Sequence, residues 1–168
     1  MPGFFRKINN LLIKILEIAV ILVMAALLID VLWGVFGRHI LNEPPTWTEE
    51  LATILLIWVS LLGASIGFIR KSHLGVDYFV GKLSARKQII LQILVYLLTA
   101  VFAIVVLIYG GIRVVHSSYV NERTSAALQW YWYKIYLVLP ISGFFIFLFS
   151  VESVIKNIAS LLGKSDSK

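Results

Sequence analysis

The composition of this 168-residue chain excludes most classes of protein before any motif is considered. Hydrophobic residues make up 60% of it and charged residues only 14%, with a mean hydropathy of +0.90, whereas soluble domains carry about 25% charged residues. This excludes a water-soluble globular domain and a disordered chain. The net charge of +6 comes from basic residues that flank apolar runs, which is typical of a membrane surface and not of a nucleic-acid site. The absence of cysteine excludes disulfides, Fe–S clusters and thiolate zinc sites.

Four apolar runs organise the chain, at residues 18–37, 51–69, 88–112 and 135–151. A helix needs about 20 apolar residues to cross a bilayer core, and the runs lack the alternation of transmembrane strands. We therefore predict an all-α membrane protein, a single integral membrane domain over 1–168. Its four transmembrane helices are expected at about 11–37, 47–69, 88–113 and 130–155. The first run is longer than the apolar part of a signal peptide, so we expect it to be retained.

The distribution of Lys and Arg predicts the orientation of these helices. Eleven of the 15 basic residues lie near the N-terminus, between the second and third helices, or near the C-terminus. Cytoplasmic segments carry this excess of positive charge, so we expect both termini in the cytoplasm. Four tryptophans near the opposite face agree with this orientation, because indole rings favour the membrane interface: Trp33, Trp47, Trp130 and Trp132.

Asp30 is the one charged residue in the first apolar run. Ionisable residues at membrane depth are functional candidates, because burying a charge in lipid is costly. The sequence favours an ion pair with Arg38 or with a cation on a partner. A proton or ion relay is the alternative, but the second and third helices contain no acidic residue at mid-span.

The second helix begins in a region rich in turn and capping signals. Pro44 and Pro45 are expected to end the first helix, and Thr46 with Glu49 has the spacing of a capping box. Glu49 and Glu50 also suit the positive end of the helix dipole. Contact with a partner subunit or a pair of chemically active carboxylates are the alternatives, the second disfavoured because adjacent side chains on a helix diverge.

Small residues form a stripe along the second helix, at Ser60, Gly63, Ala64 and Gly67. Small residues allow close approach of helices in lipid. The stripe therefore predicts a packing surface, either for this chain's own helices or for a partner subunit.

Two features follow later in the chain. Val76, Phe79, Val80 and Leu83 recur at helical spacing, which predicts a short amphipathic helix at the membrane interface, in contact with lipids or a partner. In the fourth helix, Pro140 is followed by Ser142 and Gly143, a combination that predicts a kink.

The sequence contains no catalytic constellation, so we do not expect an enzyme. Polar residues within the spans are sparse, which argues against transport by this chain alone. Two other functions stay open: a haem- or quinone-binding anchor of an oxidoreductase, with His39 and His116 as the residues to test, and a small proton-coupled exporter that uses Glu17.

Several segments together resemble a known family, the small membrane subunit of tripartite ATP-independent periplasmic (TRAP) transporters. The similar segments are residues 37–40, 42–44, 47–51, 57–58, 62–64, 70–77, 132–133 and 136–144. Their order and spacing cover nearly the whole chain. One departure is His39, where the family commonly has an aromatic residue.

The resemblance implies a scaffold function in the bacterial inner membrane. A large membrane subunit would carry the sodium and substrate sites and move by an elevator-type mechanism, and a periplasmic binding protein would deliver an organic acid such as a C4-dicarboxylate or a sialic acid. No cofactor is then expected on this chain, since sodium would bind the large subunit. Within the similar segments, His73 and Asp77 join the candidates for partner contact or structure: Asp30, Arg38, Glu49, Glu50, Ser60, Gly63, Ala64, Gly67 and Pro140.

Overall fold

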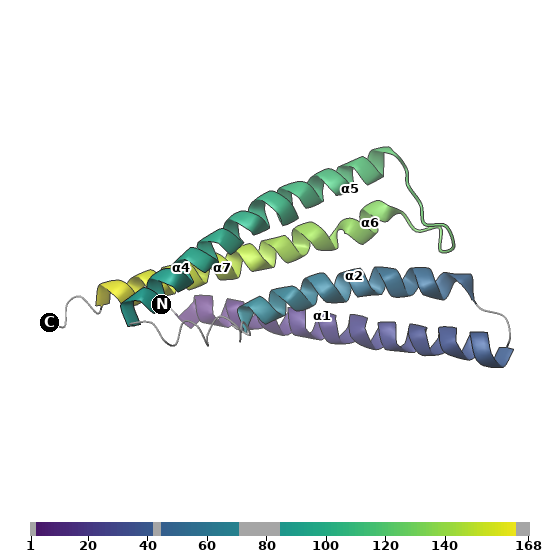
Figure 1. Cartoon of the computed structure of the whole chain (residues 1–168), viewed down its shortest axis with the longest axis horizontal. Coiled ribbons are helices and arrows are strands. Elements are labelled where there is room, and N and C mark those ends of the chain that lie inside the picture. The colour runs from purple at the N-terminus through teal and green to yellow at the C-terminus, as the bar shows by residue number, and fades with distance from the viewer. Residues whose placement is uncertain (1–2, 42–44, 71–84, 164–168) are drawn as a thin grey trace. The chain divides into compact units, whose positions relative to one another are not determined.

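A computed structural model describes residues 3–41, 45–70 and 85–163 and contains only helices and the connections between them (Figure 1). The elements are α1 (Gly3–Phe36), η1 (Gly37–Leu41), α2 (Thr46–Ile69), α4 (Ala85–Phe102), η2 (Ala103–Gly110), α5 (Gly111–Val120), α6 (Trp132–Tyr136) and α7 (Val138–Gly163). The segments η1 and η2 are π-helical. The all-α fold expected from the apolar runs is confirmed.

Four of the helical stretches are long and apolar enough to cross a membrane: Asn10–Ile40, Thr46–Phe68, Lys87–Val120 and Trp132–Ser160. The third continues past residue 113, its expected end, because α5 extends to Val120 beyond the uncharged run. The predicted amphipathic helix, with His73 and Asp77, lies outside the described residues.

The chain divides into two compact units. The first comprises residues 1–66 and 114–138, and the second comprises residues 67–113 and 139–168. In the first unit, α1 and η1 are followed by the antiparallel α2 (Figure 1). Close packing joins the two helices at Gly34, where an added Cβ would lie 3.1 Å from Thr48 Oγ1. The indole Nε1–H of Trp58 on α2 donates to the carbonyl of Ile135 on α6 at 3.1 Å.

In the second unit, two glycines set the close approach of η2 and α5 to α7. A Cβ added at Gly143 would lie 2.7 Å from Leu107 Cβ, and one at Gly111 would lie 2.9 Å from Leu139 Cβ. Without side chains, both positions let neighbouring helices come near enough for extensive van der Waals contact in lipid. An edge-to-face ring pair, Phe68 with Tyr96 at 5.6 Å between centroids, packs elsewhere in this unit.

Pro140 lies in the first turn of α7, and the helix is interrupted at Leu137, between α6 and α7. Proline has no N–H to donate to the carbonyl four residues earlier, here that of Tyr136, and its ring crowds that carbonyl. Ser142 forms a hydrogen bond in the same turn, because its hydroxyl donates to the carbonyl of Leu139 at 2.9 Å.

Candidate functional site

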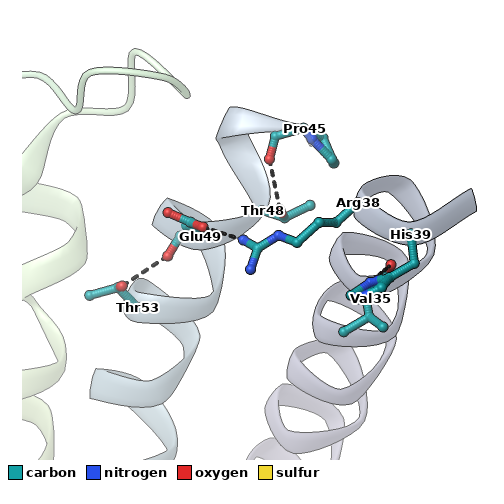
Figure 2. Close-up of polar contacts among 7 residues, drawn as sticks. All are labelled: Val35, Arg38, His39, Pro45, Thr48, Glu49 and Thr53. Carbon is teal, nitrogen blue, oxygen red and sulfur yellow. Dashed lines mark hydrogen bonds and ion pairs between the residues drawn. The ribbon is translucent and has the colours of Figure 1, made fainter. Parts of the chain in front are cut away.

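Glu49 and Glu50, two of the carboxylates singled out in the sequence, lie near the start of α2, at the end of the first unit where α1 and η1 connect to α2. The start of α2 is fixed by Thr48, whose buried hydroxyl donates to the Pro45 carbonyl at 2.8 Å (Figure 2). This bond differs from N-capping, in which a side chain accepts from a free backbone N–H. The helix begins at Thr46, and the capping box of Thr46 and Glu49 stays a prediction. Thr53 then donates to the backbone carbonyl of Glu49 at 2.9 Å.

Glu49 forms an ion pair with Arg38, with 2.7 Å between Glu49 Oε1 and the guanidinium nitrogen (Figure 2). The pair links η1 to the first turn of α2. Both side chains are exposed, at 59% for Arg38 and 77% for Glu49. Exposed ion pairs contribute little to stability, so its main effect is to orient Arg38.

Glu50 makes a different and more extensive set of contacts. Its carboxylate accepts three backbone hydrogen bonds from the loop that precedes α6: from Ala126 at 2.9 Å, Ala127 at 2.7 Å and Leu128 at 2.9 Å. An ionised carboxylate is an acceptor only, which suits three converging N–H donors. These bonds hold together two parts of the chain that are 76 to 78 positions apart in sequence.

The loop held by Glu50 has a defined conformation of its own. The buried Ser125 and the exposed Trp130 are joined by two hydrogen bonds. The Ser125 N–H donates to the Trp130 carbonyl at 2.8 Å, and the Trp130 N–H donates to Ser125 Oγ at 3.2 Å. Gln129 has a φ of 56°, a left-handed conformation that closes the turn. Sequence reasoning missed this loop, because its only local signal was the aromatic block at 130–133.

Asp30 is nearly fully buried, with 5% of its surface exposed. Neither carboxylate oxygen has a hydrogen-bond partner among the residues that the structure describes. The ion pair expected between Asp30 and Arg38 does not form; Arg38 binds Glu49 instead. The reason is geometric, since eight residues of helix place Arg38 about 12 Å farther along the axis.

Two cavities adjoin these residues within the first unit. One, of about 880 Å³, runs between α1 and the start of α2 and includes Asp30 in its lining. The other, of about 590 Å³, lies among α1, α2 and α6 and is lined by Ile54, Trp58 and Lys134 among others. The ammonium of Lys134 lies 5.7 Å from the ring centroid of Tyr131 and 5.9 Å from that of Tyr133.

The stripe of small residues on α2 has free space beside its glycines. A Cβ added at Gly63 or at Gly67 would meet no atom within 4 Å among the described residues. The close glycine contacts in the described residues are instead those of Gly34, Gly111 and Gly143. The prediction that Ser60, Gly63, Ala64 and Gly67 form a packing surface therefore stays a prediction.

A cofactor or metal site would require histidines or other ligand side chains that lie close together. His39 Nδ1 lies 3.1 Å from the Val35 carbonyl oxygen, a geometry in which the ring N–H donates (Figure 2). No group of three or more His, Cys, Asp or Glu side chains placed to hold a metal ion is found within 3–41, 45–70 and 85–163. At this end of the first unit, the polar contacts of Arg38, Glu49 and Glu50 lie beside the apolar helices α1 and α2.

Comparisons with known proteins give the family. Residues 27–160 match the family described as "Tripartite ATP-independent periplasmic transporters, DctQ component". The sialic acid TRAP transporter small permease protein SiaQ of Vibrio cholerae serotype O1 is 32% identical over 164 residues, which are 96% of this chain and 90% of that protein. The C4-dicarboxylate TRAP transporter small permease protein DctQ of Rhodobacter capsulatus is 29% identical, over 58% of this chain and 42% of that protein.

A third relative is much longer than this chain. The isethionate TRAP transporter permease protein DctMQ of Oleidesulfovibrio alaskensis is 34% identical over 96 residues, which are 57% of this chain but only 15% of that protein. The family match covers most of the chain, and the Vibrio cholerae relative is similar nearly from end to end. This chain therefore belongs to the DctQ family, the small permease components of TRAP transporters.

Proposed function

We propose that this chain is the scaffold subunit of a sodium-gradient-driven TRAP transporter that imports an organic acid across the bacterial inner membrane. The observation that carries the proposal is the similarity to the Vibrio cholerae small permease over 164 residues. The relatives reported above are all named as TRAP transporter components. Their names favour this function over a haem-binding anchor or a proton-coupled exporter.

The contacts of the first unit support a scaffold. Glu50 and Trp58 connect α2 to segments more than 70 residues away along the chain, and Arg38 connects η1 to α2. These bonds fix the relative positions of α1, α2 and α6. Large apolar side chains on α1 stay exposed, for example Ile21 at 65% and Ile29 at 68%, and offer surface to lipids and to a membrane partner.

The large membrane subunit is the principal partner in this proposal. The matched segment of the Oleidesulfovibrio alaskensis protein is a small part of a much longer permease, as expected if this type of sequence works beside a larger transport domain. With both termini cytoplasmic, the loop held by Glu50 faces the periplasm. There it is available to the periplasmic binding protein.

Sialic acid is the first substrate to test, with a C4-dicarboxylate second. The sialic acid relative is matched over 90% of its length and the C4-dicarboxylate relative over 42%. Both substrates are carboxylic acids. In this proposal sodium and substrate bind the large subunit, and this chain holds no cofactor.

The test is uptake by bacterial cells that lack their own carriers for both acids. Cells that express this chain, the large subunit and the binding protein are given labelled sialic acid or labelled succinate, in sodium or in potassium buffer. We expect sodium-dependent uptake of one of the two acids. Equal uptake in both buffers would contradict sodium coupling, and uptake of neither acid would contradict the substrate class.

A further inference from the structure

Asp30 differs from the other buried polar side chains that the structure describes. The buried hydroxyls of Thr48, Ser65, Ser142 and Ser150 each donate to a backbone carbonyl. Within the described residues, the two carboxylate oxygens of Asp30 are the only buried side-chain nitrogen or oxygen atoms that lack a hydrogen bond. Buried polar groups in folded proteins are nearly always bonded, so the missing partner of Asp30 requires an explanation.

The basic residues of α1 and η1 do not supply that partner. Arg38 is held by Glu49 at 2.7 Å. Lys14 lies sixteen residues before Asp30, about 24 Å along the helix axis at the usual rise per residue. The ring of His39 is engaged with the carbonyl of Val35. Asp30 therefore has no cationic partner among the residues that the structure describes, and a cation from a neighbouring subunit is a candidate partner.

The surroundings of Asp30 are shaped to receive such a partner. It lines the cavity of about 880 Å³ between α1 and α2, here called the Asp30 groove, and among the described residues of that lining it is the only charged one. The rest of the lining is apolar and includes Ile29, Leu32, Trp33, Phe36, Trp47 and Leu51. Several of these side chains are more than one-third exposed, so their apolar surface is open to a neighbour.

The depth of Asp30 indicates which kind of cation fits. Asp30 lies ten residues before the end of the apolar span at Ile40, about 15 Å along the helix. A position this far inside the span favours a protein side chain over a lipid amine, since lipid amines lie in the headgroup layer. A bare metal ion would need several oxygen ligands, and among the described lining residues Asp30 is the only one with a side-chain oxygen. A Lys or Arg side chain carries an apolar stem that suits the groove and a charged end that suits the carboxylate.

We propose that the Asp30 groove receives a transmembrane helix of the large permease subunit, and that an Arg or Lys side chain of that helix forms an ion pair with Asp30. This proposal rests on the proposed function, because it takes the large subunit as partner. Both carboxylate oxygens are covered by the surrounding residues of this chain, so the pair requires a long Lys or Arg side chain and a shift of the side chains that cover Asp30. The pair fixes the register of the two subunits, because the surrounding apolar contacts are tolerant of sliding.

The first test compares variants of Asp30 in the full complex. A tagged form of this chain is co-expressed with the large subunit and purified in detergent. We expect Asp30→Asn, which keeps the shape and removes the charge, to reduce the recovered large subunit at least about tenfold, as breaking a buried charge pair does. Asp30→Glu keeps the charge and should retain most of the binding. Glu152→Gln is the matched control, since Glu152 already pairs with Lys156 in this chain.

The stability of the isolated chain separates this proposal from a structural role within the chain. Because Asp30 makes no bond within the described residues, Asp30→Asn should leave the melting temperature of the isolated chain unchanged or raise it. A large decrease would show that Asp30 stabilises its own chain and would overturn the proposal.

Chemical protection gives an independent readout. Dicyclohexylcarbodiimide modifies carboxyl groups in apolar surroundings, and the labelled residue is identified by mass spectrometry. We expect Asp30 to react in the isolated chain and to be protected in the complex. Equal labelling in both states, or normal recovery of the large subunit with Asp30→Asn, would overturn the groove assignment alone. Failure of the unmodified chain to bind the large subunit would instead contradict the proposed function.

Discussion

Glu49 and Glu50 are adjacent in sequence, yet they make unrelated contacts. Successive residues on a helix point about 100° apart, so one carboxylate turns toward Arg38 and the other toward the loop at 126–128. The exposed ion pair of Glu49 replaces contacts with water and contributes little to stability. Glu50 instead accepts hydrogen bonds from three backbone N–H groups. Glu50 therefore contributes more to the order of this end of the molecule.

Glu50→Gln should lower the melting temperature of the purified chain. A glutamine presents an NH₂ group to backbone N–H donors and loses an acceptor, so at least one of the three N–H groups loses its bond to this side chain. Glu49→Gln, in the same turn of α2, is the control and should change the melting temperature little. Circular dichroism in detergent measures both. A larger effect of Glu49→Gln would contradict this account of the two residues.

The sequence identified Asp30, Glu49 and Glu50 as candidate residues but did not predict which groups they contact. Two adjacent carboxylates at a helix start indicate capping or partner contact, but the donors to Glu50 are 76 to 78 residues away. Backbone N–H groups carry no sequence signature, so no motif pointed to 126–128. Asp30 was recognised as a candidate, but its expected pairing with Arg38 ignored the helical rise that separates the two side chains.

At the scale of helices, glycine spacing alone was a poor guide to close packing. Gly63 and Gly67 have the spacing typical of packed membrane helices, yet space beside both is open. Gly111 and Gly143 lack such a motif and make the closest approaches. Which glycine is needed depends on which faces meet, and this is decided by the whole packing arrangement rather than by one helix.

Gly143→Ala should destabilise the isolated chain, because its new methyl group would lie 2.7 Å from Leu107 Cβ. Overpacking of this kind costs about 1–3 kcal/mol. Gly63→Ala is the matched control in another helix: the methyl group has room, and alanine favours the helix by about 0.5–1 kcal/mol over glycine. Thermal unfolding of both variants tests the contrast. Equal destabilisation would show that Gly63 is also closely packed within this chain.

At the scale of the whole molecule, the all-α fold was predictable because the length of each apolar run decides whether it forms a membrane-spanning helix. The four apolar runs gave four long helices. The charge distribution gave an orientation that is still a prediction. The contacts that join segments far apart in the chain, such as Trp58 with Ile135, depend on tertiary packing and had no counterpart in the local pattern.

The predicted orientation can be tested by single-cysteine labelling, since the chain contains no cysteine of its own. Ala127→Cys has an exposed side chain in the loop held by Glu50, and Ser167→Cys is near the C-terminus. In intact cells with a permeable outer membrane, a membrane-impermeant maleimide should label Ala127→Cys and not Ser167→Cys. The reverse pattern would place both termini in the periplasm and contradict the positive-inside assignment.

The central claim is that this chain is a supporting subunit that transports nothing by itself. The most direct measurement is sodium-driven uptake of the organic acid into proteoliposomes that contain this chain alone, the large subunit alone, or both, each with the binding protein outside. The account predicts uptake only when both membrane subunits are present. Uptake by this chain alone, or full uptake by the large subunit without it, would contradict the claim.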